Sequence, residues 1–193
     1  MGGIDKALMP LSGRPMVAHV LARLTPQVVA VAVNVNGEQS SYRTLGCQLI
    51  ADANQDFAGP LAGVLAGLRW AAMLPQRPSH LVTVAVDLPL LPVDLVEQLA
   101  AGQKSKQPAI VVARSAGSLH PVCALLPLSL ADDLAGALID GCCKVREWQQ
   151  RHPVVIVDFP LIEAGDSTID PFFNINTPAD LADAEAILKS LSR

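Results

Sequence analysis

The segment Leu81-Val-Thr-Val-Ala-Val-Asp87-Leu-Pro-Leu-Leu-Pro92 decides the fold class. It opens with six residues, five of them apolar, and continues into a carboxylate and a proline-containing turn. An apolar run of this length predicts a strand buried on both faces, as in parallel sheets covered by helices. Because ligands of such sheets bind outside the carboxyl ends of the strands, we expect Asp87 to lie at a binding crevice.

The same pattern, an apolar strand that ends in polar residues, recurs along the chain. Residues 28–36 predict a strand that ends in Asn34 and Asn36, and residues 48–52 predict one that ends in Asp52. Other strands are expected over 108–113, 122–126, 154–158 and 172–176, and helices over 16–24, 38–45, 60–73, 92–101, 128–139, 144–151 and from 178 onward. Strands that alternate with helices favour a three-layer α/β domain with a mostly parallel sheet.

Composition narrows the class of protein further. A chain of 193 residues with 51% hydrophobic content is long enough for a single domain with a sizeable core. The formal net charge of −4 argues against a nucleic-acid or membrane-surface protein. No apolar run reaches the ~18–20 residues of a membrane span and no cationic leader opens the sequence, so we expect a cytoplasmic protein. Four cysteines without a CxxC pair or zinc-ligand spacing indicate reduced thiols.

The candidate chemistry rests on Asp87 and a divalent cation. A buried lone carboxylate is costly unless it is paired or bound to a metal, and Mg²⁺ binds through one or two carboxylates together with water and substrate phosphates. The four histidines form neither HxxxH nor HExxH, and no G-x-S-x-G supports a serine hydrolase.

His120 lies in a predicted turn over 117–121, where an ordinary loop histidine is the simpler interpretation. Thr177, followed by Pro178 and Asp180, is interpreted as a helix N-cap.

Several segments resemble the MobA-like nucleotidyltransferase family. The opening residues Gly2-Gly3-Ile-Asp5-Lys6-Ala-Leu, with Leu11-Ser-Gly13-Arg14-Pro15, are similar to the second half of the family's nucleotide-loop motif. The other matching segments follow in the family's order and span nearly the whole chain. They are Val33-Asn34-Val-Asn36, Asp52, Gly59-Pro60-Leu-Ala-Gly63, Asp87-Leu-Pro89, His120-Pro121 and Asn174-Ile-Asn176-Thr177-Pro178.

The resemblance implies a Rossmann-like nucleotidyltransferase domain over residues 1–193. It implies transfer of GMP from GTP to molybdopterin, with release of pyrophosphate and formation of the guanine dinucleotide form of the molybdenum cofactor. Mg²⁺ is the implied cofactor. GTP, molybdopterin and proteins that mature molybdoenzymes are the implied partners, without nucleic acid or membrane.

Carried over residue by residue, the resemblance assigns a role to each candidate. Lys6 binds the GTP phosphates and acts with Asp87 in catalysis. Asn34 and Asp52 fall where the family contacts the guanosine part. Asp87 falls where it contacts GTP and coordinates Mg²⁺.

Asn174 and Asn176 fall on the side of the family's site that faces the pterin.

Two alternative functions stay open at this point. One is a cytidylyl- or sugar-nucleotide transferase of the same fold, although Val86-Asp87-Leu-Pro89 resembles the guanylyl branch more than the Gly-Asp-Gln-Pro of the cytidylyl branch. The other is a non-catalytic module that binds the pterin cofactor.

The chain departs from the family at its start. Met1 lies inside the nucleotide-loop motif, so the preceding strand, the Leu-Ala-Gly-Gly loop and the arginines are absent. We therefore expect a form truncated relative to the family, with the true start upstream of Met1. Because that loop's backbone N–H groups cradle the triphosphate, its loss is expected to weaken nucleotide binding.

Overall fold

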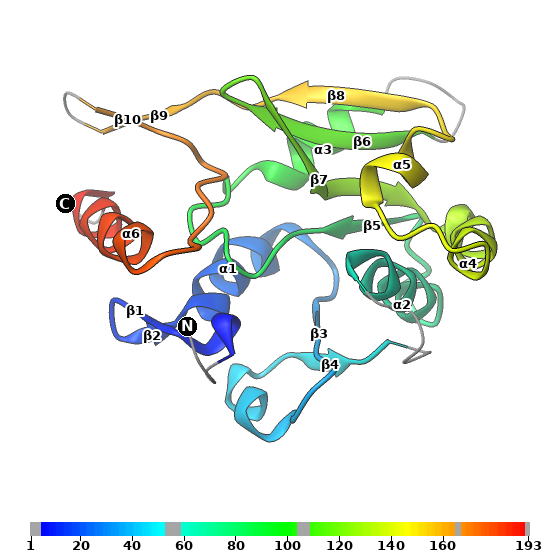
Figure 1. The fold of residues 1–193 in the computed structure, drawn as a ribbon, viewed down its shortest axis with the longest axis horizontal. Coiled ribbons are helices and arrows are strands. Elements are labelled where there is room, and N and C mark those ends of the chain that lie inside the picture. Colours follow the sequence, from blue (N-terminus) through cyan, green and yellow to red (C-terminus); the bar gives the residue numbers. More distant parts are fainter. Residues whose placement is uncertain (1–4, 53–58, 104–108, 165–166, 192–193) are drawn as a thin grey trace.

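The computed structural model describes residues 5–52, 59–103, 109–164 and 167–191, and its main sheet has four strands in the order β5-β7-β6-β8. These strands are β5 (His80–Thr83), β6 (Ile110–Ser115), β7 (Ser118–Pro127) and β8 (Val154–Asp158). β7 is antiparallel to β5 and β6, and β8 is parallel to β6. Within this sheet three strands therefore run in one direction, with β7 against them (Figure 1).

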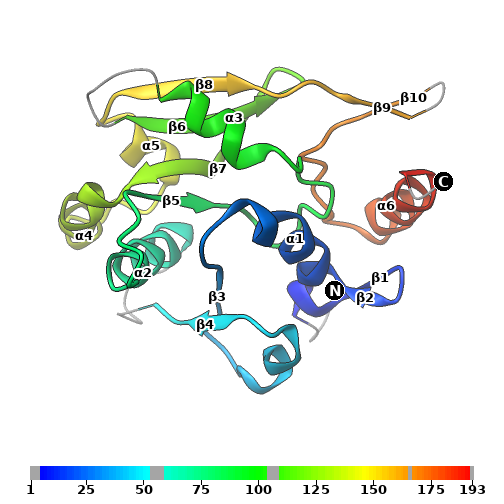
Figure 2. The same cartoon turned by 180° about the vertical axis from the view of Figure 1, so that it is seen from behind.

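Helices cover both faces of this sheet, as the two opposite views in Figures 1 and 2 show. Ile110 and Val112 of β6 pack in one apolar cluster, and Val111 and Ala113 pack in another, as the two-residue period of a strand requires. The first cluster includes residues of α2 (Pro60–Ala72), α4 (Ala131–Ile139) and α5 (Val145–Gln149), and the second those of α1 (Met16–Leu24) and α3 (Leu95–Gly102). The three-layer α/β fold predicted from the sequence is confirmed.

A second, smaller sheet continues beyond β5. β3 (Ala32–Asn34) and β4 (Gln48–Ile50) form a parallel pair, with the 3₁₀ helix η3 (Ser40–Leu45) between them in sequence. In Figure 1 the strands β8, β6, β7 and β5 are followed by β3 and β4. Among the described residues, no strand pairing joins β3 to β5.

The remaining elements gather around α1 and the end of the chain. They are η1 (Lys6–Leu8), β1 (Pro10–Leu11), β2 (Arg14–Pro15), η2 (Thr25–Gln27), η4 (Leu128–Leu130), β9 (Ile162–Ala164), β10 (Ser167–Ile169) and α6 (Pro178–Leu191). Leu11, Met16, Ile175 and Ala184 form a buried cluster that holds the β1–β2 hairpin, α1 and α6 together. In the part of the chain that the structure describes, no helix combines the length and the apolarity needed to cross a bilayer.

Helix 16–24 and strand 154–158 occur at their predicted bounds, whereas two apolar strands are shorter than predicted. The predicted strand 28–36 is paired only from Ala32 to Asn34, and the run from Leu81 is paired only to Thr83. Residues 28–31 and 84–86 of these runs line a cavity instead. A strand needs a hydrogen-bonded neighbour, and these runs are longer than the neighbours available to them.

Two further predictions are wrong. Residues 117–121 are not one turn, because β7 begins at Ser118 and the tight turn lies at Ala116 and Gly117, both with positive φ. His120 is therefore a strand residue. Residues 172–176 form no strand; this irregular segment is held by side-chain contacts and capping bonds. The β9–β10 hairpin was not predicted.

Candidate functional site

Four of the predicted site residues meet in one cluster around the Lys6 ammonium. Lys6 Nζ lies 2.5 Å from Asp87 Oδ2 and 2.7 Å from Asn176 Oδ1, with Asn174 Oδ1 at 3.4 Å. The Lys6 side chain is 33% exposed and that of Asp87 15% exposed. An ammonium group donates three hydrogen bonds, and these three oxygens take them.

The backbone before Lys6 is fixed by its neighbour Asp5. The Asp5 carboxylate accepts a hydrogen bond from the Ala7 N–H (3.1 Å) and caps η1, and it also accepts one from the Tyr42 hydroxyl. Ala7 and Tyr42 are both buried in the cluster around Val33. Burial, together with Asp5, raises the pKa of the Tyr42 hydroxyl, so this phenol stays protonated and continues to donate. These contacts orient Lys6 toward the end of β5.

The two asparagines reach Lys6 because Ile175 between them is anchored. The Ile175 N–H donates to the Asp87 carbonyl (3.2 Å), and its side chain is 1% exposed in the α6 cluster. Asn174 and Asn176 flank this buried residue, and both present their amide oxygens to the ammonium.

The start of α6 immediately follows and is capped as predicted. Asp180 N–H donates to Thr177 Oγ1 (3.1 Å), and Asp180 Oδ2 accepts from the N–H groups of Asn176 and Thr177 (2.8 Å each). These backbone hydrogen bonds lower the pKa of Asp180, so the cap stays charged. The cap fixes the backbone of Asn176.

One oxygen of Asp87 has no partner among the described residues. Oδ2 binds Lys6, whereas Oδ1 is buried and accepts no hydrogen bond there. A buried, unpaired carboxylate oxygen is costly and suits a cation ligand. No group of three or more His, Cys, Asp or Glu side chains is present among the described residues that could hold a metal by itself. One available carboxylate oxygen nevertheless fits Mg²⁺, which takes most of its ligands from water and substrate phosphates.

A second cluster lies at the carboxyl ends of β3 and β4. Asp52 Oδ1 accepts from Asn34 Nδ2 (2.9 Å), Asp52 Oδ2 accepts from Asn36 Nδ2 (2.6 Å), and the Asp52 N–H donates to Asn36 Oδ1 (2.9 Å). Parallel pairing of Asn34 with Ile50 places these three residues together. The reciprocal bonds of Asn36 give it a positioning role for Asp52 that the sequence did not reveal.

Asn34 also contacts the first turns of α2. A Cβ added at Gly63 would lie 3.2 Å from Asn34 Oδ1, so the glycine permits this close approach. Gly59, which precedes α2, has a φ of +107°, a conformation that favours glycine. Local structure therefore explains why both positions, Gly59 and Gly63, are occupied by glycine.

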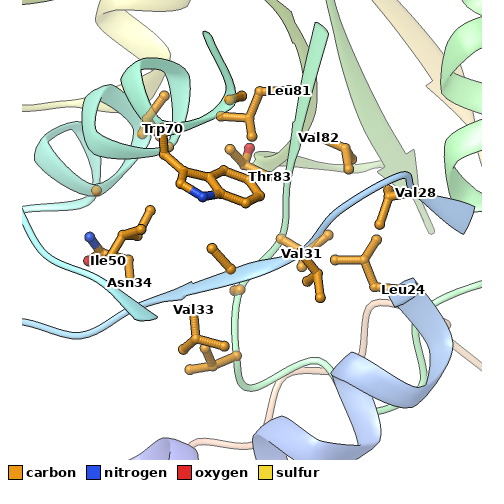
Figure 3. A pocket seen from close by; sticks show the side chains of 18 of the residues that line it. Leu24, Val28, Val31, Val33, Asn34, Ile50, Trp70, Leu81, Val82 and Thr83 are labelled. Carbon is orange, nitrogen blue, oxygen red and sulfur yellow. The ribbon is translucent and has the colours of Figure 1, made fainter. Parts of the chain in front are cut away.

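Both clusters contribute to the lining of a cavity of about 500 Å³, the first through Asp87 and the second through Asn34, Asn36 and Asp52. Most of the other lining residues are apolar (Figure 3). Gly2 and Gly3 of the opening motif lie outside the described residues. The structure thus brings Lys6, Asp87, Asn174 and Asn176 together, and places Asn34 and Asp52 in a second cluster beside the same cavity.

His120 joins neither cluster. Ser115 Oγ donates to Asp170 Oδ1 (2.6 Å), which leaves the serine oxygen to accept from His120 Nε2–H (2.7 Å). The imidazole stacks on Phe172 with ring centroids 4.4 Å apart. Burial lowers the pKa of His120, against the opposing charge of Asp170. His120 anchors the segment that leads to Asn174.

Comparison with known proteins agrees with this geometry. Residues 1–161 match the family described as the MobA-like NTP transferase domain. The chain is 43% identical over 194 residues to a molybdenum cofactor guanylyltransferase of Rhodopseudomonas palustris, a match that covers 100% of this chain and 90% of that protein.

Solved structures show the same fold. The molybdopterin-guanine dinucleotide biosynthesis protein A of Archaeoglobus fulgidus superposes with a TM-score of 0.71 at 24% identity, covering 97% of this chain and 92% of that one. A Mycobacterium tuberculosis protein solved in complex with manganese superposes with a TM-score of 0.67 at 15% identity, covering 95% and 93%. On the family match and the relative's identity together, this chain belongs to the MobA-like NTP transferase family of nucleotidyltransferases.

Proposed function

We propose that this protein transfers GMP from GTP to molybdopterin. The observation that carries the proposal is that two carboxylates line one cavity, Asp87 paired with Lys6 and Asp52 held by two amides. The name of the R. palustris relative supports the substrate pair. We assign the Lys6–Asp87 cluster to the phosphates of GTP and the Asp52 cluster to the guanine base.

The reaction is an in-line displacement at the α-phosphorus of GTP. An oxygen of the molybdopterin phosphate forms the new bond to this phosphorus, and the bond from the phosphorus to the α–β bridging oxygen breaks. Pyrophosphate leaves with the bonding electrons. No covalent enzyme intermediate is required, so the protein contributes positioning and charge stabilisation.

Lys6 and Asp87 take opposite parts in this step. The Lys6 ammonium donates hydrogen bonds to the phosphate oxygens and stabilises the charge that develops on pyrophosphate. Asp87 would hold Mg²⁺ through Oδ1, the oxygen that has no hydrogen-bond partner among the described residues. Bound there, Mg²⁺ would supply Lewis-acid stabilisation of the phosphoryl oxygens. The N-terminus of α2, at Gly59 and Pro60 of the same cavity, adds positive partial charge near the triphosphate.

Asp52 supplies a reason for guanine preference. Its carboxylate can accept further hydrogen bonds besides those from Asn34 and Asn36. Guanine offers two adjacent donors, N1–H and the N2 amino group, which match one carboxylate, whereas cytosine offers only its N4 amino group on that edge. Asn174 and Asn176 accept from the same Lys6 ammonium as Asp87 and are proposed to face the pterin.

Calorimetric titration of the protein with GTP and with CTP, in Mg²⁺, tests this assignment. GTP should bind more tightly, and Asp52→Asn should narrow the difference between the two nucleotides. Asp132→Asn is the matched control, because Asp132 is exposed in the first turn of α4. Tighter binding of CTP would replace the guanylyl proposal by the cytidylyl one. The ratio is informative even if the absolute affinity is low.

A further inference from the structure

Ser115, the last residue of β6, has a buried hydroxyl with a partner on each side. The residue is 2% exposed, and its hydroxyl donates to Asp170 Oδ1 (2.6 Å) while it accepts from His120 Nε2 (2.7 Å). Loss of a buried hydrogen bond of this kind is costly, because the remaining partner is left unsatisfied. Ser115 therefore ties the β6–β7 hairpin to the chain that follows β10.

A break in the register of β6 and β7 brings His120 to this serine. The pairing shifts between Val112 and Ala113, so that His120 lies opposite Ala113, where an unbroken register would place Cys123. Ala113 and Ser115 lie on the same face of β6, because side chains alternate along a strand. His120 therefore reaches Ser115 as a diagonal neighbour, and the bulge in β7 aims the imidazole at it.

Two carbonyls of the bulged segment accept hydrogen bonds from side chains of other elements. Gln149 Nε2 of α5 donates to the Pro121 carbonyl (2.8 Å), and Thr83 Oγ1 of β5 donates to the Val122 carbonyl (2.6 Å). Gln149 is itself buried, at 4% exposed. These contacts hold the bulge in place, and with it the direction of His120.

Asp170 carries the connection into a tight turn. Besides the bond from Ser115, its Oδ1 accepts from the Phe172 N–H (2.8 Å), and its carbonyl accepts from the Phe173 N–H (3.0 Å). Aspartate side chains commonly close turns in this way. The turn lies in the segment that leads from β10 to α6 (Figure 1).

The aromatic side of the same turn is held as well. Phe172 is 3% exposed and stacks on His120, with ring centroids 4.4 Å apart. Its other aromatic neighbour is Phe159, in an edge-to-face contact at 5.2 Å. Ser115 and His120 thus act on one turn through a hydrogen bond and through ring packing.

The two asparagines beyond the turn differ in what holds them. The Asn176 N–H donates to Asp180 Oδ2 in the cap of α6, so Asn176 has an anchor that does not depend on the turn. Asn174 lies between two buried residues, Phe172 before it and Ile175 after it. A change in the turn should therefore move Asn174 more than Asn176.

We propose that Ser115 and Asp170 are positioning residues for Asn174, and that through Asn174 they set the fit of the acceptor substrate. Neither Ser115 nor Asp170 lines the cavity, so both act through the segment that they hold. The link to the acceptor rests on the proposed function, in which Asn174 faces the pterin. The positioning of Asn174 does not depend on which nucleotide is transferred.

Three variants separate positioning from general stability. Asp170→Ala removes the acceptor of both hydrogen bonds, whereas Asp170→Asn keeps an acceptor oxygen for them and is the conservative rescue. Asp133→Ala is the matched control, because Asp133 Oδ1 also accepts two hydrogen bonds, from Trp148 Nε1 and His152 Nε2 (2.9 Å each), and Asp133 does not line the cavity. Ser115→Ala removes one of the two bonds to Asp170 and takes the place of Asp170→Ala if that variant does not fold.

Hydrogen exchange of the substrate-free protein is the first measurement. In Asp170→Ala the amides of residues 172–175 should exchange at least about tenfold faster than in wild type, because the turn opens locally. Asp170→Asn should keep the wild-type protection, and in Asp133→Ala this segment should change no more than the rest of the chain. Equal exchange of residues 172–175 in Asp170→Ala and wild type would overturn the proposal, whatever reaction the protein catalyses.

Steady-state kinetics of guanine dinucleotide formation is the second measurement. Asp170→Ala should raise the KM for molybdopterin about three- to tenfold, the equivalent of about one hydrogen bond, and should leave the calorimetric affinity for GTP unchanged. Asp170→Asn should restore the wild-type KM. A wild type that forms no guanine dinucleotide would overturn the proposed function and the link to the acceptor, while the exchange measurement would still decide the positioning of Asn174.

A double-mutant cycle tests whether the effect passes through Asn174. Asp170→Ala should raise the KM for molybdopterin by the same factor in wild type and in Asn176→Ala, but should add little to Asn174→Ala. A full additional effect in Asn174→Ala, or an unchanged KM in an active Asp170→Ala variant, would overturn the proposal.

Discussion

Lys6 Nζ and Asp87 Oδ2 lie 2.5 Å apart although 81 positions separate the two residues in sequence. The pair joins η1 to the segment after β5, and the amide oxygens of Asn174 and Asn176 complete the shell of the ammonium. In the absence of a nucleotide each charge neutralises the other. When a triphosphate and Mg²⁺ bind, both charges acquire new partners in the proposed mechanism.

Asp87→Asn should abolish most of the transferase activity. The amide keeps the size of the side chain but loses the charge that Mg²⁺ requires, and we expect kcat/KM to fall at least about a hundredfold. A radiolabelled GTP assay of guanine dinucleotide formation measures the change. Asp132→Asn should retain activity, and comparable rates for both variants would contradict the role of Asp87.

Lys6→Met should lower the activity with GTP. Removal of charge-assisted hydrogen bonds worth ~1.5–3 kcal/mol lowers kcat/KM about ten- to a hundredfold. Lys6→Arg keeps the charge but changes the geometry, so we expect intermediate activity. The order wild type, Lys6→Arg, Lys6→Met is the predicted result, and equal activity of Lys6→Met and wild type would exclude contact with phosphate.

Gly63→Ala and Gly136→Ala form a matched pair in two helices. Gly136 has open space around it, so an added methyl group should stabilise α4 by ~0.5–1 kcal/mol through helix propensity. At Gly63 the methyl group meets Asn34 Oδ1 at 3.2 Å, so the Asn34 amide must shift by a few tenths of an ångström. We expect Gly63→Ala to weaken GTP binding about three- to tenfold, the equivalent of about one hydrogen bond. Unchanged GTP affinity would show that Asn34 does not contact the nucleotide.

The stability of the protein should depend on pH through His120. Burial lowers the pKa of His120 in the folded state below its unfolded value of about 6.5, so the folded protein favours the neutral ring. As pH falls below about 6.5 the unfolded state takes up a proton that the folded state resists, and stability is lost. Below the pKa of His120 in the folded state, the free energy of unfolding no longer changes through this group.

Urea unfolding at pH 7.5, 6.5 and 5.5 checks this sign. His120→Gln keeps a donor for Ser115 Oγ but removes the titration. The free energy of unfolding of wild type relative to this variant should decrease as pH falls. A difference that stays constant, or that grows on acidification, would contradict a lowered pKa for His120.

Much of the fold could be predicted from local patterns. The periodicity of helix 16–24 and the apolar run of strand 154–158 predicted these elements at their observed bounds. The extent of β3 and β5 could not be predicted in the same way, because a strand extends only as far as its neighbours allow. Residues 28–31 and 84–86 have strand-forming sequences, yet they line the cavity.

The candidate site could likewise be predicted only in part, because some of its residues depend on tertiary contacts. Family motifs identified Lys6, Asp87 and the two asparagines, and the fold brings these residues within contact of one another. The roles of Asp5 and Asn36 went unnoticed because they depend on partners 37 and 16 positions away. Residues 172–176 were wrongly predicted as a strand, since their apolar side chains pack in tertiary clusters without strand pairing.

The most direct test of the central claim is anomalous diffraction from a crystal of this protein soaked with GTP and Mn²⁺. The account predicts Mn²⁺ density next to Asp87 Oδ1, with the triphosphate bound to the ion and to Lys6 Nζ. Ordered Mn²⁺ and triphosphate at a position away from Asp87 would contradict it.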